Sequence, residues 1–370
     1  MSMDPEVENY SESLADVGSA VLAALAAMEQ VQRRLHPPAI EALRSSVRPF
    51  AERLSAARER FSQITPPPPL EPLHQRLAQA AELTAHSLSL FVKPAAPDEA
   101  VARIIRSLRS TAEALEVLYS IHQLPPISRF FVEKPFQHDI AGLDPQPREG
   151  IETGLMHTSG DDESRAWGGF SLYVPERYDG SEARPLVVAL HGGMGHGREF
   201  IWQWLREARG RQFLLLAPTS QQSTWALMGS DVDTPALYAA LDYVRGRWRV
   251  DADSILLTGL SDGATYALLH GLRADSPYTA IAPFSGVLHP ENLENGNLER
   301  AKGRRIYMVH GALDWMFPVA TARMASETLK KAGARLVYRE IADLSHTYDR
   351  DENDRVLSWF DKRLALPPTE

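Results

Sequence analysis

The stretch SILLTGLSDG at residues 254–263 decides the fold of this chain. A mostly apolar run, 254–258, leads directly into Gly-Leu-Ser-Asp-Gly, and a run of helix-forming residues, 264–272, follows. A buried strand that turns sharply through G-x-S-x-G into a helix is the nucleophile-elbow pattern. Its two flanking glycines let the strand and the helix pass close together without a Cβ clash. The pattern predicts that Ser261 lies at the tip of a strained turn, where a neighbouring base activates its hydroxyl.

Two later apolar runs end beside residues that would complete such a site. The run 305–309 is followed by His-Gly-Ala-Leu and then Asp314, and the run 335–341 is followed closely by His346. With Ser261, these residues occur in the order nucleophile, acid, base that the elbow demands. Each lies just past a predicted strand, at the edge where open α/β sheets bind their ligands. We therefore predict a Ser-His-Asp triad.

An earlier strand supplies the expected oxyanion hole. The apolar run 185–190 leads into the glycine-rich sequence HGGMG at 191–195. In hydrolases with this elbow, one backbone N–H from such a loop and one from the residue after the nucleophile bind the developing oxyanion. We expect these donors to be Gly193 and Asp262, with Met194 as the alternative to Gly193.

From about residue 151 to its end, the chain resembles the α/β-hydrolases, close to the phospholipase/carboxylesterase and polyhydroxyalkanoate-depolymerase-like esterases. The motifs that carry the resemblance are LHGG at 190–193, GLSDG at 259–263, HGALD at 310–314 with Pro318, and Ser345-His346. The resemblance implies ester hydrolysis without a metal or organic cofactor. Asp262 departs from the pattern, because many relatives carry a neutral residue there. Its side chain should point away from the oxyanion, since a carboxylate would oppose the developing charge.

Other residues near these motifs have competing interpretations. His191 and His196 lie in the glycine loop, but no third ligand is near them in sequence, so no metal site is expected. Asp343 competes with Asp314 for the acid role. It precedes His346 too closely to reach the far nitrogen of that ring easily, and Asp314 is favoured.

Large apolar residues beside the site suggest a substrate pocket. Trp315 and Phe317 flank the predicted acid, and Met194 lies in the glycine loop. We expect these three to line the pocket for the acyl group. Trp225 is a weaker candidate, because large aromatic residues more often belong to a core.

The composition agrees with a soluble enzyme of two domains. The chain has 370 residues and a net charge of −9, with acidic and basic residues mixed along its length. This charge argues against a nucleic-acid partner. There is no cysteine, and thus no disulfide or thiolate chemistry. No basic leader with a cleavage motif is expected, and no apolar run approaches the roughly 18 residues of a membrane span. A cytoplasmic location is the default expectation.

The first third of the chain has a different pattern of apolar residues, which is typical of helices. Apolar residues recur there at spacings of three and four in four stretches, which is typical of amphipathic helices. Prolines at 37–38, 66–69 and 94–97 separate the stretches. An up-and-down helical bundle is predicted, in which Pro49 should kink or split the second helix. The bundle could be a structural or dimerising domain, which would give a homodimer, or a cap that shapes the acyl pocket.

Together these patterns predict an all-α helical bundle at 1–123, a proline-rich linker or arm at 124–150, and an α/β-hydrolase domain at 151–370. The arm is expected to pack on the hydrolase. The hydrolase should contain a mostly parallel sheet flanked by helices. We expect its strands to lie side by side in chain order, beginning with the run 170–174.

The predicted function is that of a serine carboxylesterase that acts through an acyl-enzyme on a small or lipid-like ester. A polyester depolymerase, thioesterase or peptidase would use the same triad, because fold and triad do not select the leaving group. A non-catalytic, hydrolase-like binding or scaffold protein is the other alternative. The complete set of serine, acid, histidine and glycine loop argues against it.

Overall fold

The computed structural model describes residues 5–94, 96–145, 148–158 and 166–367. The chain divides into two compact units, Met1–Phe131 and Val132–Glu370. The second unit thus includes most of the stretch 124–150 that was expected to be a linker or arm.

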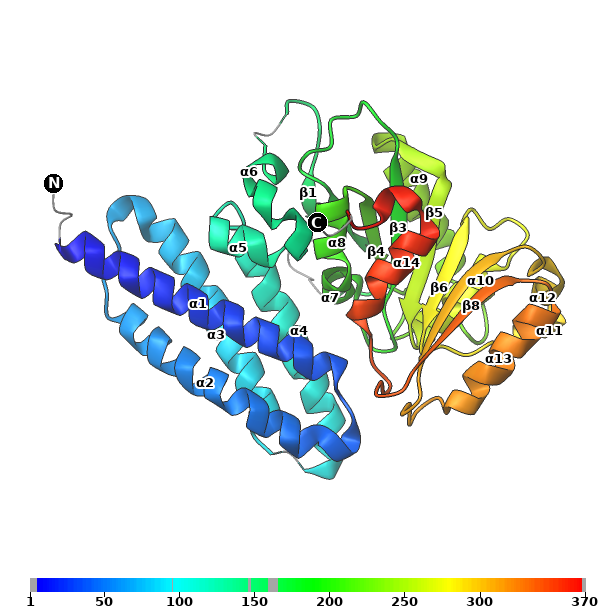
Figure 1. The fold of residues 1–370 in the computed structure, drawn as a ribbon, viewed down its shortest axis with the longest axis horizontal. Helices are drawn as coiled ribbons and strands as arrows, with labels where there is room; N and C mark the ends of the chain where they lie inside the picture. The colour runs from blue at the N-terminus through cyan, green and yellow to red at the C-terminus, as the bar shows by residue number, and fades with distance from the viewer. Residues whose placement is uncertain (1–4, 95, 146–147, 159–165, 368–370) are drawn as a thin grey trace. The chain divides into compact units, whose positions relative to one another are not determined.

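The first unit is helical (Figure 1). Its helices are α1 (Pro5–Arg33), α2 (Ile40–Ser62), α3 (Glu71–Val92), α4 (Pro97–Tyr119) and α5 (Pro125–Phe130). The proline-rich breaks form short 3₁₀ helices at Pro37–Ala39 and Pro68–Leu70, so that each long helix starts just after the proline-rich break that ended the last. Between α3 and α4, the hydroxyls of Ser87 and Ser107 each donate to the other's carbonyl at 2.8 Å. These small side chains let the two helices approach closely.

Pro49 does not split the second helix. α2 runs unbroken from Ile40 to Ser62 with Pro49 inside it. The proline lies on an exposed face, whereas Val47 and Leu54 are buried. The carbonyl of Ser45, which loses its helical partner to the proline, is therefore on the side where water can bind it.

Of the described helices, α1 is long and apolar enough, by length and composition alone, to cross a membrane. An 18-residue window within Glu8–Arg33 has a mean hydropathy of 1.4. The expectation that no stretch approaches this length is therefore wrong, because the alanines between the larger apolar residues raise the average. Val17, Val21 and Leu25 of this helix are nevertheless fully buried inside the helical unit. A core helix of a helical domain has the same composition.

The second unit contains an eight-stranded sheet with the order β1-β2-β4-β3-β5-β6-β7-β8. The strands are β1 (Gly154–His157), β2 (Phe170–Val174), β3 (Arg184–Leu190), β4 (Leu214–Pro218), β5 (Val250–Leu260), β6 (Ala280–Phe284), β7 (Arg305–Gly311) and β8 (Arg335–Ile341). The pairs β1–β2 and β2–β4 are antiparallel. All the other neighbouring pairs, from β4–β3 to β7–β8, are parallel. The central strands are buried along almost their whole length, as expected when helices cover both faces.

The strands do not lie in chain order, and this part of the prediction is wrong. β4 pairs between β2 and β3, and the chain then returns across β3 to form β5 on its other side. The direction of winding therefore reverses between β3 and β5. In open α/β sheets such a reversal leaves a crevice at the carboxyl ends of the two strands, where ligands bind.

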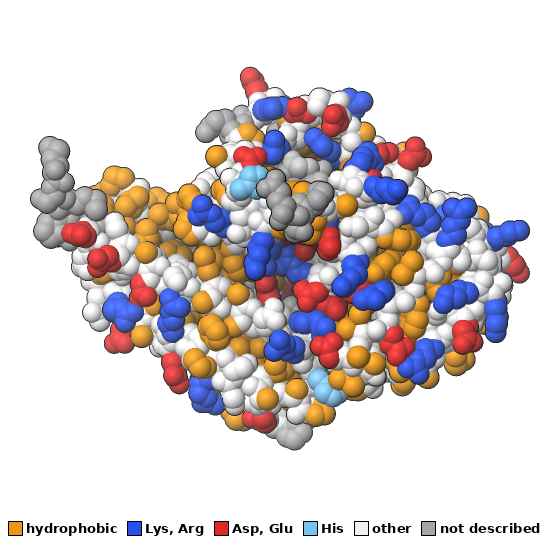
Figure 2. All heavy atoms as spheres, in the orientation of Figure 1, with side chains coloured by type: hydrophobic (Ala, Val, Ile, Leu, Met, Phe, Trp, Pro, Cys, Tyr) orange, Lys and Arg blue, Asp and Glu red, His pale blue; other side chains and the backbone are white. Residues whose placement is uncertain are grey.

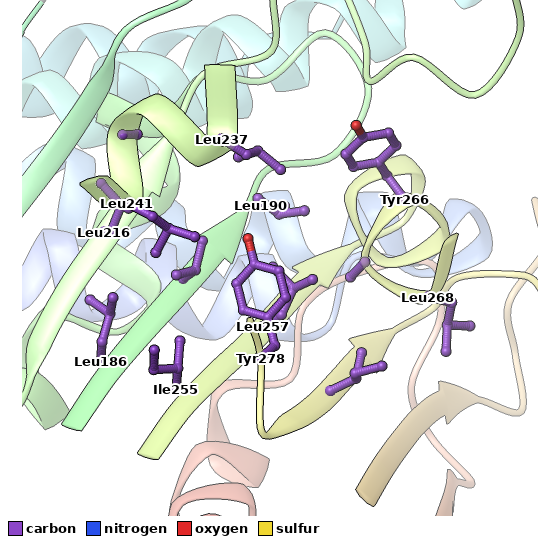
Figure 3. Close-up of a cluster of buried hydrophobic side chains, with 14 of the residues drawn as sticks. Leu186, Leu190, Leu216, Leu237, Leu241, Ile255, Leu257, Tyr266, Leu268 and Tyr278 are labelled. Atoms are coloured by element: carbon purple, nitrogen blue, oxygen red, sulfur yellow. The ribbon is translucent and has the colours of Figure 1, made fainter. Parts of the chain in front are cut away.

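The principal helices of this unit are α7 (Gly197–Phe200), α8 (Leu205–Arg211), α9 (Asp233–Arg247), α10 (Asp262–Gly271), α13 (Val319–Lys331) and α14 (Asn353–Phe360). Figure 3 shows one face of the sheet packed against α9 and α10. Leu186, Ile255 and Leu257 from the strands meet Leu237 and Leu241 of α9 there, and all are buried. This core fixes β5 and α10 on either side of the elbow.

Two buried arginines on α8 hold the segment that begins the second unit. The Arg209 guanidinium lies 2.6 Å from an Asp144 oxygen, and Arg211 donates to both oxygens of Glu133 at 2.8 and 2.5 Å. Both arginine side chains are almost completely buried. A buried charge needs such a partner, so these pairs fasten residues 132–144 to the body of the unit.

Candidate active site

Ser261 lies at the point where β5 ends and α10 begins. Its backbone has φ 55° and ψ −117°, a conformation that non-glycine residues seldom adopt. The Ser261 N–H donates to the Phe284 carbonyl at the end of β6, at 2.9 Å. The two glycines are required by close contacts: a Cβ at Gly259 would lie 2.6 Å from backbone atoms of Gly263, and one at Gly263 would lie 2.3 Å from the His191 carbonyl oxygen.

The structure brings the three predicted triad residues together. The Oγ of Ser261 lies 2.9 Å from Nε2 of His346, and Nδ1 of the same ring lies 2.9 Å from Oδ2 of Asp314. A carboxylate can only accept, so Nδ1 carries the proton and donates to Asp314. Nε2 is then an acceptor for the Ser261 hydroxyl. This is the arrangement in which a histidine can take a serine proton.

The Asp314 carboxylate is held on both of its oxygens. Oδ1 accepts the N–H groups of Met316 and Phe317 at 3.0 and 2.8 Å, while Oδ2 faces His346. Burial raises the pKa of this carboxyl, but the hydrogen bonds from His346 and Phe317 outweigh it and leave the pKa below its ordinary value. Asp314 is therefore ionised at neutral pH. The rival acid, Asp343, has an exposed side chain.

His310 is a second ring beside the same carboxylate. Its Nε2 donates to the Phe317 carbonyl at 2.8 Å and lies 3.3 Å from Oδ2 of Asp314. Burial lowers its pKa, so the ring stays neutral. His310 thereby links the start of the acid loop to its end.

The expected oxyanion donors are Gly193 in the glycine loop and Asp262 directly after Ser261, with Met194 as the alternative to Gly193. The N–H of Met194 already donates to the Ser223 carbonyl at 2.7 Å, which removes Met194 as the alternative donor. Within the described part of the chain, the N–H groups of Gly193 and Asp262 have no acceptor, and the latter is at the first position of α10. These two groups are the ones left available to a ligand.

The Asp262 side chain is occupied elsewhere. Its Oδ2 accepts the Thr224 hydroxyl at 2.6 Å. A Cβ on Gly193 would lie only 2.6 Å from the same oxygen, so the carboxylate packs directly on the glycine. Thr224 was not predicted, and nothing in the sequence around it indicates a role.

The histidines of the glycine loop serve structure. Nε2 of His191 accepts the Ser220 N–H at 3.1 Å, and Nδ1 donates to the Gly192 carbonyl at 2.7 Å. Burial is the main cause that lowers the pKa of His191 to about 4, so this ring is neutral. Nδ1 of His196 accepts the Arg198 N–H and caps α7. Each ring nitrogen of the two residues has a protein partner.

The three residues expected to line the pocket differ in their contacts and in their exposure to solvent. The Phe317 ring stands edge-on to His346, with centroids 5.1 Å apart. Met194 is 54% exposed and Trp315 is 53% exposed, so both present apolar surface to solvent beside the site. Trp225 is buried in the sheet core, and its Nε1 donates to the His191 carbonyl at 2.7 Å.

Comparison with known proteins finds a family match within the second unit. Residues 221–363 match the phospholipase/carboxylesterase family. No curated protein matches the chain.

Several solved esterases are similar to part of the chain. A thermostable esterase is 22% identical, with a TM-score of 0.42, over 54% of this chain and 56% of its own, so the chain spans little more than half of that protein. Esterase PE8 is 27% identical, with a TM-score of 0.40, over 48% of this chain and 91% of its own. The esterase Est2 of the planctomycete Thermogutta terrifontis is 19% identical, with a TM-score of 0.41, over 57% and 90%. The match to the phospholipase/carboxylesterase family lies within the second unit, whose mixed sheet with flanking helices has the α/β-hydrolase architecture and is preceded in this chain by a helical unit.

Proposed function

We propose that this protein is a serine carboxylesterase. The observation that carries the proposal is the His346 ring, whose two nitrogens each lie 2.9 Å from their partner, Ser261 on one side and Asp314 on the other. A serine whose hydroxyl is hydrogen-bonded to an imidazole, itself oriented by an ionised carboxylate, is equipped for acyl transfer. The family match favours an ester as the acyl donor.

The reaction follows from these contacts. His346 takes the hydroxyl proton as Ser261 attacks the ester carbonyl, and Asp314 stabilises the resulting imidazolium. The N–H groups of Gly193 and Asp262 bind the oxyanion of the tetrahedral intermediate. His346 then protonates the departing alcohol. A water molecule, activated by the same ring, hydrolyses the acyl-enzyme and restores Ser261. These steps use only groups of the protein and water.

The substrate is proposed to be a small or lipid-like ester. Met194, Trp315 and Phe317 offer apolar contacts on the acid and oxyanion sides of the serine. An acyl chain that covers these side chains removes apolar surface from water, at about 25 cal/mol per Å². The proposal therefore expects activity to depend on acyl chain length.

The test is hydrolysis of p-nitrophenyl esters from acetate to palmitate by the wild type and by Ser261→Ala. The variant should lose about 10⁶-fold in kcat, because nucleophile and base act as a unit. Ser285→Ala is a matched control: Ser285 also follows a strand with positive φ and is buried, but its hydroxyl has no partner among the described residues.

A fluorophosphonate separates the alternatives. Labelling of Ser261 without turnover of simple esters would move the proposal to a polyester, thioester or peptide substrate with the same triad. If the protein showed no labelling and no turnover, an enzymatic role would be contradicted and a binding protein would be favoured. Ser261→Ala with near wild-type activity would also contradict the mechanism.

A further inference from the structure

The loop between β4 and α9, residues 219–232, contains none of the residues assigned to chemistry above. Its contacts nevertheless converge on the glycine loop with His196, residues 191–196, here called the oxyanion loop. Two of them reach His191: the Ser220 N–H donates to Nε2 of the ring at 3.1 Å, and the Trp225 indole donates to the carbonyl at 2.7 Å. The first residue of the oxyanion loop is thus fixed on both its ring and its backbone.

Two further contacts lie next to the proposed donor N–H groups. The Ser223 carbonyl accepts the N–H of Met194, which has φ 60° and directly follows Gly193. The Thr224 hydroxyl donates to Oδ2 of Asp262 at 2.6 Å. Ser223 and Thr224 are adjacent in this loop. Ser223 holds Met194, the neighbour of Gly193, and Thr224 holds the side chain of Asp262.

The loop is itself closed by a buried carboxylate. Asp233, at the start of α9, is 1% exposed. Its Oδ1 accepts the Gln221 N–H at 2.7 Å, and its Oδ2 accepts the Ala226 N–H at 2.6 Å. These bonds span the segment 221–226, which includes Ser223 and Thr224. The position of Thr224 is therefore set by the body of the domain.

We propose that Thr224 is a positioning residue for the oxyanion hole, acting through Asp262 to keep the N–H groups of Gly193 and Asp262 aimed at one point. Its hydroxyl turns the Asp262 carboxylate towards the 219–232 loop, where the carboxylate packs on Gly193. This inference rests on the proposed esterase function. It explains how an acidic residue can follow the nucleophile, where its charge would otherwise oppose the oxyanion.

The test compares Thr224→Val with Thr224→Ser and with a remote control. Valine keeps the shape of the side chain and removes the hydroxyl, whereas serine keeps the hydroxyl. Thr279→Val is the control, because Thr279 also makes side-chain hydrogen bonds, to the backbone of Ile255, but this contact lies in the middle of β5, away from the elbow at Ser261. All are measured on the full chain for kcat and KM with one p-nitrophenyl ester, and for inhibition by a trifluoromethyl ketone. The Ser261 oxygen adds to the carbonyl carbon of this ketone and forms a hemiketal oxyanion, while His346 takes the proton of the Ser261 hydroxyl.

Thr224→Val should lower kcat about 10- to 100-fold, which is the effect of a small misplacement of catalytic groups. KM should change little, and the inhibition constant of the ketone should rise in parallel with the loss in kcat. Thr224→Ser should restore most of the activity. Thr279→Val should change the melting temperature without a selective loss of kcat.

Wild-type kcat in Thr224→Val would overturn the inference while the esterase function stands. So would a loss that Thr224→Ser does not recover, or one that Thr279→Val reproduces, because either would indicate a purely structural role. A wild-type protein that neither turns over esters nor reacts with a fluorophosphonate would overturn the proposed function instead.

Discussion

At the scale of the residue, the two candidate acids make different predictions. Asp314 accepts a hydrogen bond from the His346 ring that faces Ser261, whereas the Asp343 side chain is exposed. Asp314→Asn replaces an acceptor of the Nδ1 proton with an amide and favours the wrong tautomer, so kcat should fall by about 10⁴-fold. Asp343→Asn should stay near wild type. Ester hydrolysis near neutral pH measures both, and a larger loss in Asp343→Asn would reverse the assignment.

The triad residues could be predicted from sequence because each follows an apolar strand and the motif fixes their order. Thr224 could not, because its contact with Asp262 spans 38 residues and no motif surrounds it. The choice between Gly193 and Met194 as donor also required the structure. It depends on a bond from Met194 to the Ser223 carbonyl, which lies in another loop.

At the scale of the element, the elbow depends on the passage of α10 against the end of β3. Gly263→Ala would place a Cβ 2.3 Å from the His191 carbonyl, so α10 would have to move away from β3. The melting temperature and the esterase activity should both fall. Gly246→Ala in α9 is the matched control, because nothing lies within 4 Å of its added Cβ. It should be neutral or stabilise by roughly 0.5–1 kcal/mol. Equal thermal unfolding of the two variants would contradict the packing argument.

Most strand positions were predictable from apolar runs between turn residues, and β8 (Arg335–Ile341) was predicted at its observed bounds, but β1 (Gly154–His157) was not predicted. Strand order was not, because a run such as 214–218 reads the same at any position in the sheet. The order depends on which side of β3 each crossover packs. The same limit applies to Pro49, where the missing hydrogen bond faces water and the helix continues.

At the scale of the whole molecule, the second unit should lose stability in mild acid. Burial, as the main cause, lowers the pKa of both His191 and His270 to about 4, while an unfolded histidine titrates near 6.5. Between these values the unfolded chain binds more protons, so the free energy of unfolding falls as pH drops from about 6.5 towards 4. Each histidine contributes at most about 1.4 kcal/mol per pH unit.

Tryptophan fluorescence measures this effect in one unit, because all seven tryptophans lie in the second unit. Urea unfolding at pH 7, 6 and 5 should show a smaller decline for His270→Gln than for the wild type. The comparison isolates the histidine from carboxyl groups that titrate in the same range. Parallel declines in the two proteins would mean that His270 is not a source of the acid sensitivity.

At the scale of the whole molecule, the distribution of surface charge agrees with the distribution of charged residues along the sequence. Figure 2 shows acidic and basic side chains interspersed on the face drawn, as the mixed distribution along the chain predicts. The helical unit was also predictable from its spacing of apolar residues, because a core-facing stripe and a proline break are both local signals. Its role in the molecule was not, since a stripe that fills a core has the same pattern whatever the domain does.

The buried arginines of α8 have a consequence for how this protein can be divided or recombined. The nearest counter-charges of Arg209 and Arg211 are Asp144 and Glu133, which precede every recognisable hydrolase motif. A fragment that starts at residue 151, where the family resemblance begins, would lack both carboxylates. Breaking a buried pair costs up to about 3–5 kcal/mol, and less where a second carboxylate remains, as Glu176 does for Arg209 and Asp354 for Arg211. The smallest part of this gene that can be exchanged between proteins therefore begins near Val132, well upstream of its catalytic signature.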